Sequence, residues 1–169
     1  LDVAIKYKAQ GVKIHSSDLE NLELIKKIPK KMKVLLSCGG SNLFTISKAV
    51  NILNSKGIKP VLMHGFQAYP TNIQDINFNR LKLLLNQFKN NVSLGFQDHT
   101  SGSDKINFYL PVLAMGIGAE YIEKHITFER KKKLVDYYSS IEPKKLAEFI
   151  NIIRDLEKTI GKEDTKKIE

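Results

Sequence analysis

The sequence has little cysteine and no long apolar run, and each shortage excludes a class of protein. Cys38 is the only cysteine among 169 residues, which excludes an intramolecular disulfide framework. No stretch of eighteen apolar residues is present, and no basic segment followed by an apolar one opens the sequence. We therefore expect no signal peptide, no membrane span and no membrane partner, and we expect a cytoplasmic protein.

The formal net charge of +9 raises nucleic acid as a partner, because clustered Lys and Arg side chains bind phosphate backbones. The lysines are, however, spread over several segments beside predicted helices, without an interleaved stripe of basic and aromatic residues. We therefore favour solvated helix faces and an anionic small-molecule site over nucleic acid as the reason for the charge.

Short apolar runs alternate along the chain with longer segments of helical periodicity. The runs lie at residues 11–16, 33–38, 59–65, 92–97 and 119–125. Each is typical of a parallel strand that is buried on both faces. The alternation predicts five βα units on a parallel sheet, in one domain over residues 1–161, followed by a polar tail at 162–169.

Polar residues follow every apolar run, at the point where each strand ends. These polar groups lie at residues 13–18, 37–41, 64–71, 97–100 and 123–127. In a parallel α/β architecture the carboxyl ends of all strands lie on one rim, where ligands bind. A single polar group can be a strand that reaches solvent, but five groups at equivalent points indicate a site.

Two histidines fall at the ends of the fourth and fifth runs. Neighbouring strands lie about 4.8 Å apart, so His99 and His125 are within reach of one divalent cation although 26 positions separate them. Histidines that form hydrogen bonds within the rim are the alternative. Their spacing alone does not decide between these interpretations, because specific metal motifs carry several ligands at short fixed intervals.

Six segments of the chain together resemble the sialic acid synthase family. They are KIHSSDL, SCGG, HGFQAYPT, GFQDHTSG, GAEYIEKHITFER and DYYSSIEP, and they keep the family's order and spacing over nearly the whole chain. The resemblance implies a TIM-type (β/α)8 barrel, of which the five units are strands four to eight. A complete barrel needs about 250 residues, so we expect a fragment of a longer protein, or an open sheet completed by association.

The resemblance implies an enzyme that condenses phosphoenolpyruvate with N-acetylmannosamine or a related amino sugar, giving a nonulosonic acid and inorganic phosphate. It also implies a homodimer for the full-length protein. The alternative is a non-catalytic module that binds a sugar phosphate or another protein, because the first three strands of the barrel are missing. Whether this piece is active alone stays open.

The resemblance implies two sets of substrate-binding residues. One set matches family positions that bind phosphoenolpyruvate: Lys13, Ser16, Ser37 and Gln97. The other matches positions that contact the acceptor sugar: Asp18, Tyr69 and Asp136. A lysine amine, together with hydroxyl and backbone N–H groups of the SCGGS turn, offers a cradle for the phosphate and carboxylate of phosphoenolpyruvate.

The resemblance also implies a metal site beside the reacting atoms. His99 and His125 match the two metal ligands, so we expect a divalent cation such as Mn²⁺ or Mg²⁺ that polarises the sugar aldehyde. Asp98 is interpreted as a residue that supports the metal or forms a turn. The expected catalytic residues are Glu123, Asp18 and Lys13, and the two carboxylates are the candidates for proton transfer.

Departures from the family pattern bear on the acceptor sugar. Gln97 stands where the family usually has a serine before DHT, and Phe66 and Gln67 replace its TS before AYP. SCGG replaces STGM, and the family's GPDH is replaced at residues 134–137. The identity of the acceptor therefore stays open.

Overall fold

The computed structural model describes residues 1–161; the predicted polar tail lies outside the described residues. Five parallel strands form one sheet in the order β1-β2-β3-β4-β5, so every strand pairs with its neighbours in sequence. The strands are β1 (Gly11–Ile14), β2 (Lys33–Ser37), β3 (Val61–His64), β4 (Ser93–Asp98) and β5 (Tyr121–Lys124). The prediction of five βα units on a parallel sheet is confirmed.

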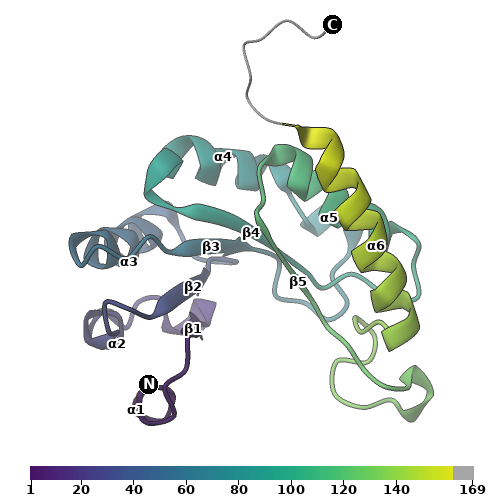
Figure 1. Ribbon diagram of the computed structural model, residues 1–169, viewed down its shortest axis with the longest axis horizontal. Helices are drawn as coiled ribbons and strands as arrows, with labels where there is room; N and C mark the ends of the chain where they lie inside the picture. Colours follow the sequence, from purple (N-terminus) through teal and green to yellow (C-terminus); the bar gives the residue numbers. More distant parts are fainter. Residues whose placement is uncertain (162–169) are drawn as a thin grey trace, which may run out of the picture.

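Helices follow the strands and lie along the outer side of an arched sheet (Figure 1). The α-helices are α1 (Asp2–Lys6), α2 (Leu22–Lys27), α3 (Leu43–Ser55), α4 (Phe78–Phe88), α5 (Ile106–Ile117) and α6 (Pro143–Ile160). Short 3-10 turns are η1 (Ser16–Asp18), η2 (Ile73–Asp75), η3 (Lys89–Asn91) and η4 (Arg130–Lys132). Within the described residues, no helix combines the length and the apolar character that a membrane span requires.

Local sequence explains where these helices begin and which side they bury. The Asn42 side chain accepts a hydrogen bond from the Thr45 amide at 2.9 Å and so caps α3. The buried residues Ile46, Ala49 and Leu53 of α3 recur at helical spacing and face the sheet. Pro143 occupies the first turn of α6, where no backbone hydrogen bond is lost.

The hydrophobic core lies between the sheet and the helices. Val34, Leu36, Leu62, Leu94 and Phe96 alternate along β2, β3 and β4, are at most 1% exposed, and belong to one cluster with residues of α3 and α4. Because side chains on a strand alternate between faces, the residues between these point to the concave side. On that side the buried residues include the apolar Val61 and Met63 of β3 and, toward the ends of β2 and β4, the polar Ser37 and Gln97.

The arch brings the two edge strands toward each other across the concave face. Near the amino-terminal ends of the strands, the Lys33 amine of β2 lies 4.6 Å from the centre of the Tyr121 ring of β5. Near the carboxyl end, Lys13 of β1 contacts Glu123 of β5. Within residues 1–161, β1 and β5 each pair with one strand only, so the sheet is an open half-barrel.

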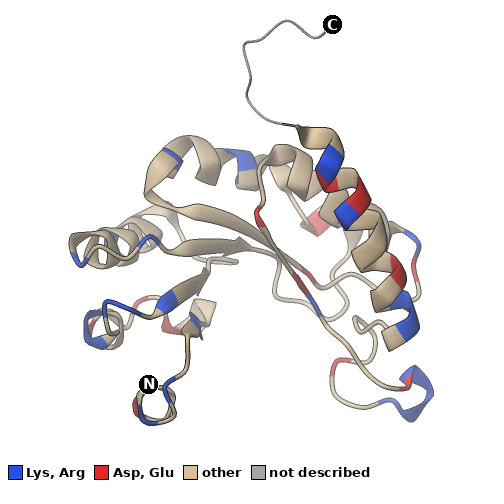
Figure 2. Cartoon of the chain, in the orientation of Figure 1, with Lys and Arg blue, Asp and Glu red and all other residues tan. Residues whose placement is uncertain are grey.

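Basic side chains are distributed over the surface in small groups. Figure 2 shows Lys and Arg scattered on the outer helices and gathered locally in the loop that contains η4. The lysines Lys26, Lys132 and Lys158 pair with nearby acidic residues on their own segments. Such exposed pairs contribute little stability, as solvated surface charges do.

We predict that Phe96→Ala lowers the free energy of unfolding by about 3–5 kcal/mol, because the ring is 1% exposed and its removal leaves a cavity against Phe78. Urea denaturation followed by circular dichroism measures this. Phe128→Ala is the matched control, since Phe128 is 91% exposed, and it should change the value by less than about 0.5 kcal/mol. Equal losses in the two variants would contradict the position of the core.

Candidate active site at the carboxyl end of the sheet

The centre of the rim is an ion pair between the two edge strands. The Lys13 amine donates to both carboxylate oxygens of Glu123, at 2.6 and 2.9 Å, although 110 positions separate the two residues. The Lys13 and Glu123 side chains are 36% and 27% exposed, so solvent and small molecules have access to both charges. The sequence predicted both residues for the site, and the structure brings them together.

A chain of hydrogen bonds extends from this ion pair across the rim. The Gln97 amide nitrogen donates to Glu123 at 3.0 Å, and its amide oxygen accepts from the Ser37 hydroxyl at 2.7 Å. Gln67 donates to the Ser37 hydroxyl at 3.3 Å and accepts from the Tyr69 hydroxyl at 2.8 Å. Ser37 and Gln97 are buried, and they bond to each other instead of facing open solvent.

Glu123 is a carboxylate with a lowered pKa. Burial raises the pKa of its carboxyl, but hydrogen bonds from Lys13 and Gln97 and the Lys13 charge outweigh burial and hold the pKa below the usual 4.5. Glu123 is therefore a carboxylate at neutral pH, and it can accept a proton but has none to give.

His99 and His125 lie edge to face on this rim. Their ring centroids are 5.2 Å apart, with the ring planes at 82°. His99 Nδ1 lies 2.7 Å from the Phe66 carbonyl oxygen, and His125 Nδ1 lies 3.4 Å from a carboxylate oxygen of Asp136. Because a carbonyl oxygen only accepts, Nδ1 of His99 carries the proton and its Nε2 has a free lone pair.

Tyr69 packs against both imidazoles. Its ring centroid lies 4.6 Å from that of His99 and 5.3 Å from that of His125.

Burial lowers the pKa of His99, and the neighbouring His125 lowers it further against the opposing effect of the Phe66 carbonyl. His99 is therefore neutral at pH 7, which is the form that ligates metals.

His99 and His125 are suited to supply two of the ligands of a metal ion. The Nδ1 hydrogen bond of His99 to the Phe66 carbonyl fixes its tautomer and ring orientation, as is typical of metal-binding histidines. Among residues 1–161, no group of three or more His, Cys, Asp or Glu side chains is placed to hold a metal. A cation on His99 and His125 would therefore complete its coordination with groups from elsewhere, such as water or substrate.

A second part of the rim suits an anion. The hollow is lined by Ser16, Ser17, Glu20, Gly39, Gly40, Ser41, Asn42, Phe66 and Gln67. The turn before α3 requires glycine, because a Cβ at Gly39 would lie 2.0 Å from the carbonyl oxygen of Gly65. Gly39 is buried, whereas Gly40 is exposed, and its backbone, just before the thirteen-residue helix α3, is the part of the turn that can offer an N–H group to an anion.

Not every predicted residue joins the network. Asp18 lies exposed in η1, and its carboxylate makes no hydrogen bond within the described residues. Asp136 has left-handed backbone, φ 58°, and joins the site only through His125. Two contributors lacked a sequence signal: the Phe66 carbonyl, which is backbone, and Gln67, which appeared only as a departure from the family pattern.

Comparisons with known proteins identify relatives of this chain. The NeuB family model matches residues 1–165. N,N'-diacetyllegionaminic acid synthase from Campylobacter jejuni is 34% identical over 88% of this chain, which corresponds to 44% of that protein. The crystal structure of N-acetylneuraminic acid synthetase from Leptospira borgpetersenii superimposes with a TM-score of 0.82 at 30% identity, covering 94% of this chain and 54% of that one.

A more distant structure shares the fold. A truncated 3-deoxy-D-arabino-heptulosonate 7-phosphate synthase from Thermotoga maritima has a TM-score of 0.77 at 18% identity and covers 95% of this chain and 63% of that one. The chain spans about half the length of the curated relatives that it matches. The prediction of a partial TIM-type barrel is confirmed by these neighbours.

We predict that Lys13→Met raises the pKa of Glu123, because the variant loses a hydrogen bond and a positive charge. In the wild type, a carboxyl with a lowered folded pKa stabilises the fold above its unfolded pKa, and this contribution is lost as the pH falls below about 5. Lys13→Met should therefore show a shallower loss of stability with acid.

Urea denaturation of the wild type and the variant over this pH range measures the difference, and a carboxyl NMR titration of Glu123 measures the pKa directly. Lys82→Met is the matched control, since Lys82 is exposed on α4. Identical acid dependence in wild type and Lys13→Met would show that the ion pair does not control the Glu123 carboxyl.

Proposed function

The chain belongs to the NeuB family, and we propose that it supplies the carboxyl-terminal part of the catalytic barrel of a synthase that condenses phosphoenolpyruvate with an amino sugar. The observation that carries the proposal is the convergence of His99 and His125 beside the Lys13–Glu123 pair on one rim. N-acetylmannosamine or a related sugar is the proposed acceptor, and a nonulosonic acid and phosphate are the proposed products.

Phosphoenolpyruvate is proposed to bind between Lys13 and the turn that precedes α3. The Lys13 amine has three protons, so it can donate to a substrate oxygen while it still contacts Glu123. Ser16 lines the hollow at this turn and has a hydroxyl for the phosphate. Ser37 and Gln97 are proposed to contact the substrate only after the hydrogen bond between them breaks.

His99 and His125 are the proposed ligands of a divalent cation such as Mn²⁺ or Mg²⁺. When bound, the cation supplies a Lewis acid that polarises the sugar aldehyde. Tyr69 and Asp136, which contact these histidines, are proposed to receive the sugar, because a phenol and a carboxylate can bind its hydroxyl groups. Asp18 would have to approach from η1 to join them.

In the proposed reaction, the methylene carbon of phosphoenolpyruvate bonds to the aldehyde carbon, the π bonds of the enol and of the aldehyde break, and the former aldehyde oxygen takes a proton from solvent. Water adds to the adjacent carbon, and the bond between that carbon and the phosphate oxygen breaks. Glu123 is the proposed acceptor of the proton from water, because it is ionised and its neighbour Lys13 holds it at the centre of the rim. Asp18 is the second candidate for this role, and it lies outside the hydrogen-bond network.

A non-catalytic module that binds a sugar phosphate is the second candidate. Two observations support this candidate. Residues 1–161 form a half-barrel with two open edges, and the predicted substrate contacts Ser37 and Gln97 are buried. For the synthase, the same open edges would be covered by the rest of the barrel, and a homodimer of the complete protein is proposed.

We predict that Glu123→Gln lowers the rate of phosphate release by about 10²–10⁴-fold, because the amide cannot accept a proton. The assay follows inorganic phosphate from phosphoenolpyruvate with Mn²⁺ and a panel of amino sugars. It compares the chain alone with the chain extended by any flanking sequence that its gene encodes. Removal of the cation with a chelator should abolish release, and returning Mn²⁺ should restore it.

His99→Ala and His125→Ala should each weaken Mn²⁺ binding by about 100-fold or more, since loss of an outer partner of a metal ligand already costs 10–100-fold. His15→Ala is the matched histidine control for cation affinity, because His15 is exposed and, within residues 1–161, its ring forms hydrogen bonds with Ser17 alone. Absence of phosphate release from both forms, with folding intact, would favour the non-catalytic module.

A further inference from the structure

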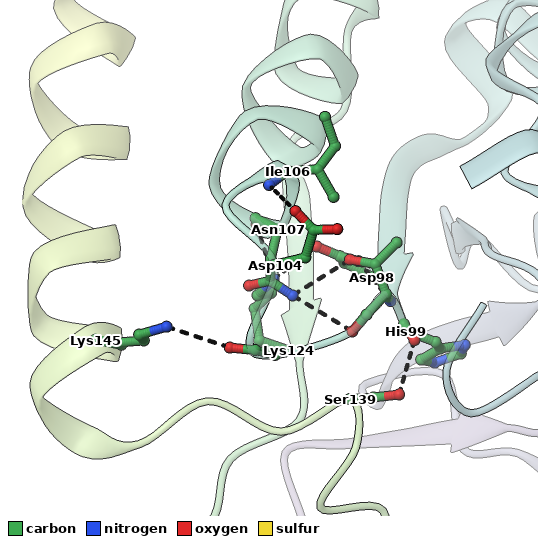
Figure 3. Close-up of polar contacts among 10 residues, drawn as sticks. Asp98, His99, Asp104, Ile106, Asn107, Lys124, Ser139 and Lys145 are labelled. Atoms are coloured by element: carbon green, nitrogen blue, oxygen red, sulfur yellow. Dashed lines mark hydrogen bonds and ion pairs between the residues drawn. The ribbon is translucent and has the colours of Figure 1, made fainter. Parts of the chain in front are cut away.

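A buried polar cluster lies on the outer side of β4 and β5, behind the rim (Figure 3). The Lys124 amine contacts Asp98 Oδ2 at 2.6 Å, and these side chains are 4% and 0% exposed. Lys124 also donates to the backbone oxygen of Asn107 at 3.0 Å and to its side-chain oxygen. All three protons of the amine therefore have acceptors.

The second oxygen of Asp98 is equally well bonded. Asp98 Oδ1 accepts from the backbone N–H of Thr100 at 2.9 Å and from its hydroxyl at 2.6 Å. The Asn107 amide nitrogen donates to the Thr100 hydroxyl oxygen at 3.3 Å, which closes the cluster. A fully bonded network of this kind holds its members in one geometry.

The cluster is connected to the rim through the chain itself. Asp98 and Lys124 are direct partners in the β4–β5 register, and each immediately precedes one of the rim histidines. Since successive side chains alternate between faces, the ion pair lies on the outer side of the sheet, whereas the histidines lie on the rim. The ion pair therefore joins the two strands at the residues directly before His99 and His125.

Stability alone is a weak reason for this ion pair. Burying two charges removes them from water, and well-packed apolar replacements of buried pairs are often as stable or more so. Burial opposes the charged form of Lys124 and lowers its pKa, although Asp98 acts in the opposite direction. The cluster therefore needs a role that an apolar pair would not fill.

Other hydrogen bonds hold the backbone at His99 and at His125. The His99 carbonyl accepts from the Ser139 hydroxyl at 2.7 Å and from the Thr71 amide at 2.9 Å. The His125 carbonyl accepts from the Ile141 amide at 2.9 Å. With their carbonyls held from the loops and their preceding residues joined by the ion pair, the two histidines have little freedom to separate.

We propose that Asp98, Thr100, Asn107 and Lys124 are positioning residues that set the separation of His99 and His125 for one divalent cation. This inference rests on the proposed function, since it assumes that the two histidines share a cation. The four residues touch neither cation nor substrate, and they act through the backbone of β4 and β5.

The test measures Co²⁺ binding to the 169-residue chain by titration calorimetry and by visible absorption. The double variant Asp98→Asn, Lys124→Met leaves no unpaired charge, and Thr100→Val keeps the side-chain shape while removing the hydroxyl. We expect the double variant to raise the Kd for Co²⁺ by about 10–100-fold. Thr100→Val should raise the Kd in the same direction by a smaller factor, because the ion pair stays intact.

Lys132→Met is the matched control, because Lys132 forms an exposed pair with Glu129 and should leave the Kd unchanged. Circular dichroism and urea denaturation establish that each variant is folded, so the Kd reports geometry instead of unfolding. A folded double variant with the wild-type Kd overturns the inference. If the double variant does not fold, Thr100→Val is measured in its place. A folded Thr100→Val variant with the wild-type Kd then overturns the inference.

The wild type separates this inference from the proposed function. Failure of the wild type to bind Co²⁺ removes the metal site from the proposed function and overturns the inference with it. Tight binding by the wild type, lost in His99→Ala but unchanged in the folded double variant, leaves the metal site standing and overturns the positioning role alone.

Discussion

The register between β4 and β5 is the constraint on which the rest of the site depends. It pairs Gln97 with Glu123 and Asp98 with Lys124, so one set of backbone hydrogen bonds places a polar contact on each face of the sheet. A slip by one residue would turn every side chain of one strand to the other face. Glu123 would then enter the helix-covered side, where its negative charge would have no cation, and Lys124 would lie on the rim.

The curvature of the sheet is the second constraint, because it turns sequence-distant edge strands into neighbours. Lys13 reaches Glu123 over three intervening strands, and Lys33 reaches Tyr121 at the opposite end of the concave face. Both contacts join a basic side chain of the amino-terminal strands to β5. Of these two lysines, Lys13 is paired with a carboxylate and stays 36% exposed, whereas Lys33 lies over an aromatic ring.

The alternation of apolar runs and amphipathic segments was sufficient to predict the sheet, because strands buried on both faces need continuous apolar sequence. The predicted run 11–16 ends in the structure as Gly11–Ile14, since the polar residues that follow leave the ladder to form the rim. Strand spacing was also sufficient to place His99 beside His125. The ion pair of Asp98 with Lys124 was not predictable in this way, because a lysine normally indicates a solvated position.

The length of the Gln97 side chain determines how the polar groups of the rim are connected. A serine at position 97 would be too short to reach both Ser37 on β2 and Glu123 on β5, whereas the Gln97 amide accepts from one and donates to the other. The Ser37 proton is thereby committed to Gln97, and Glu123 gains a second donor that stabilises its ionised form. Gln97 thus joins the Ser37 hydroxyl of β2 and the Glu123 carboxylate of β5 in one chain of hydrogen bonds across the rim.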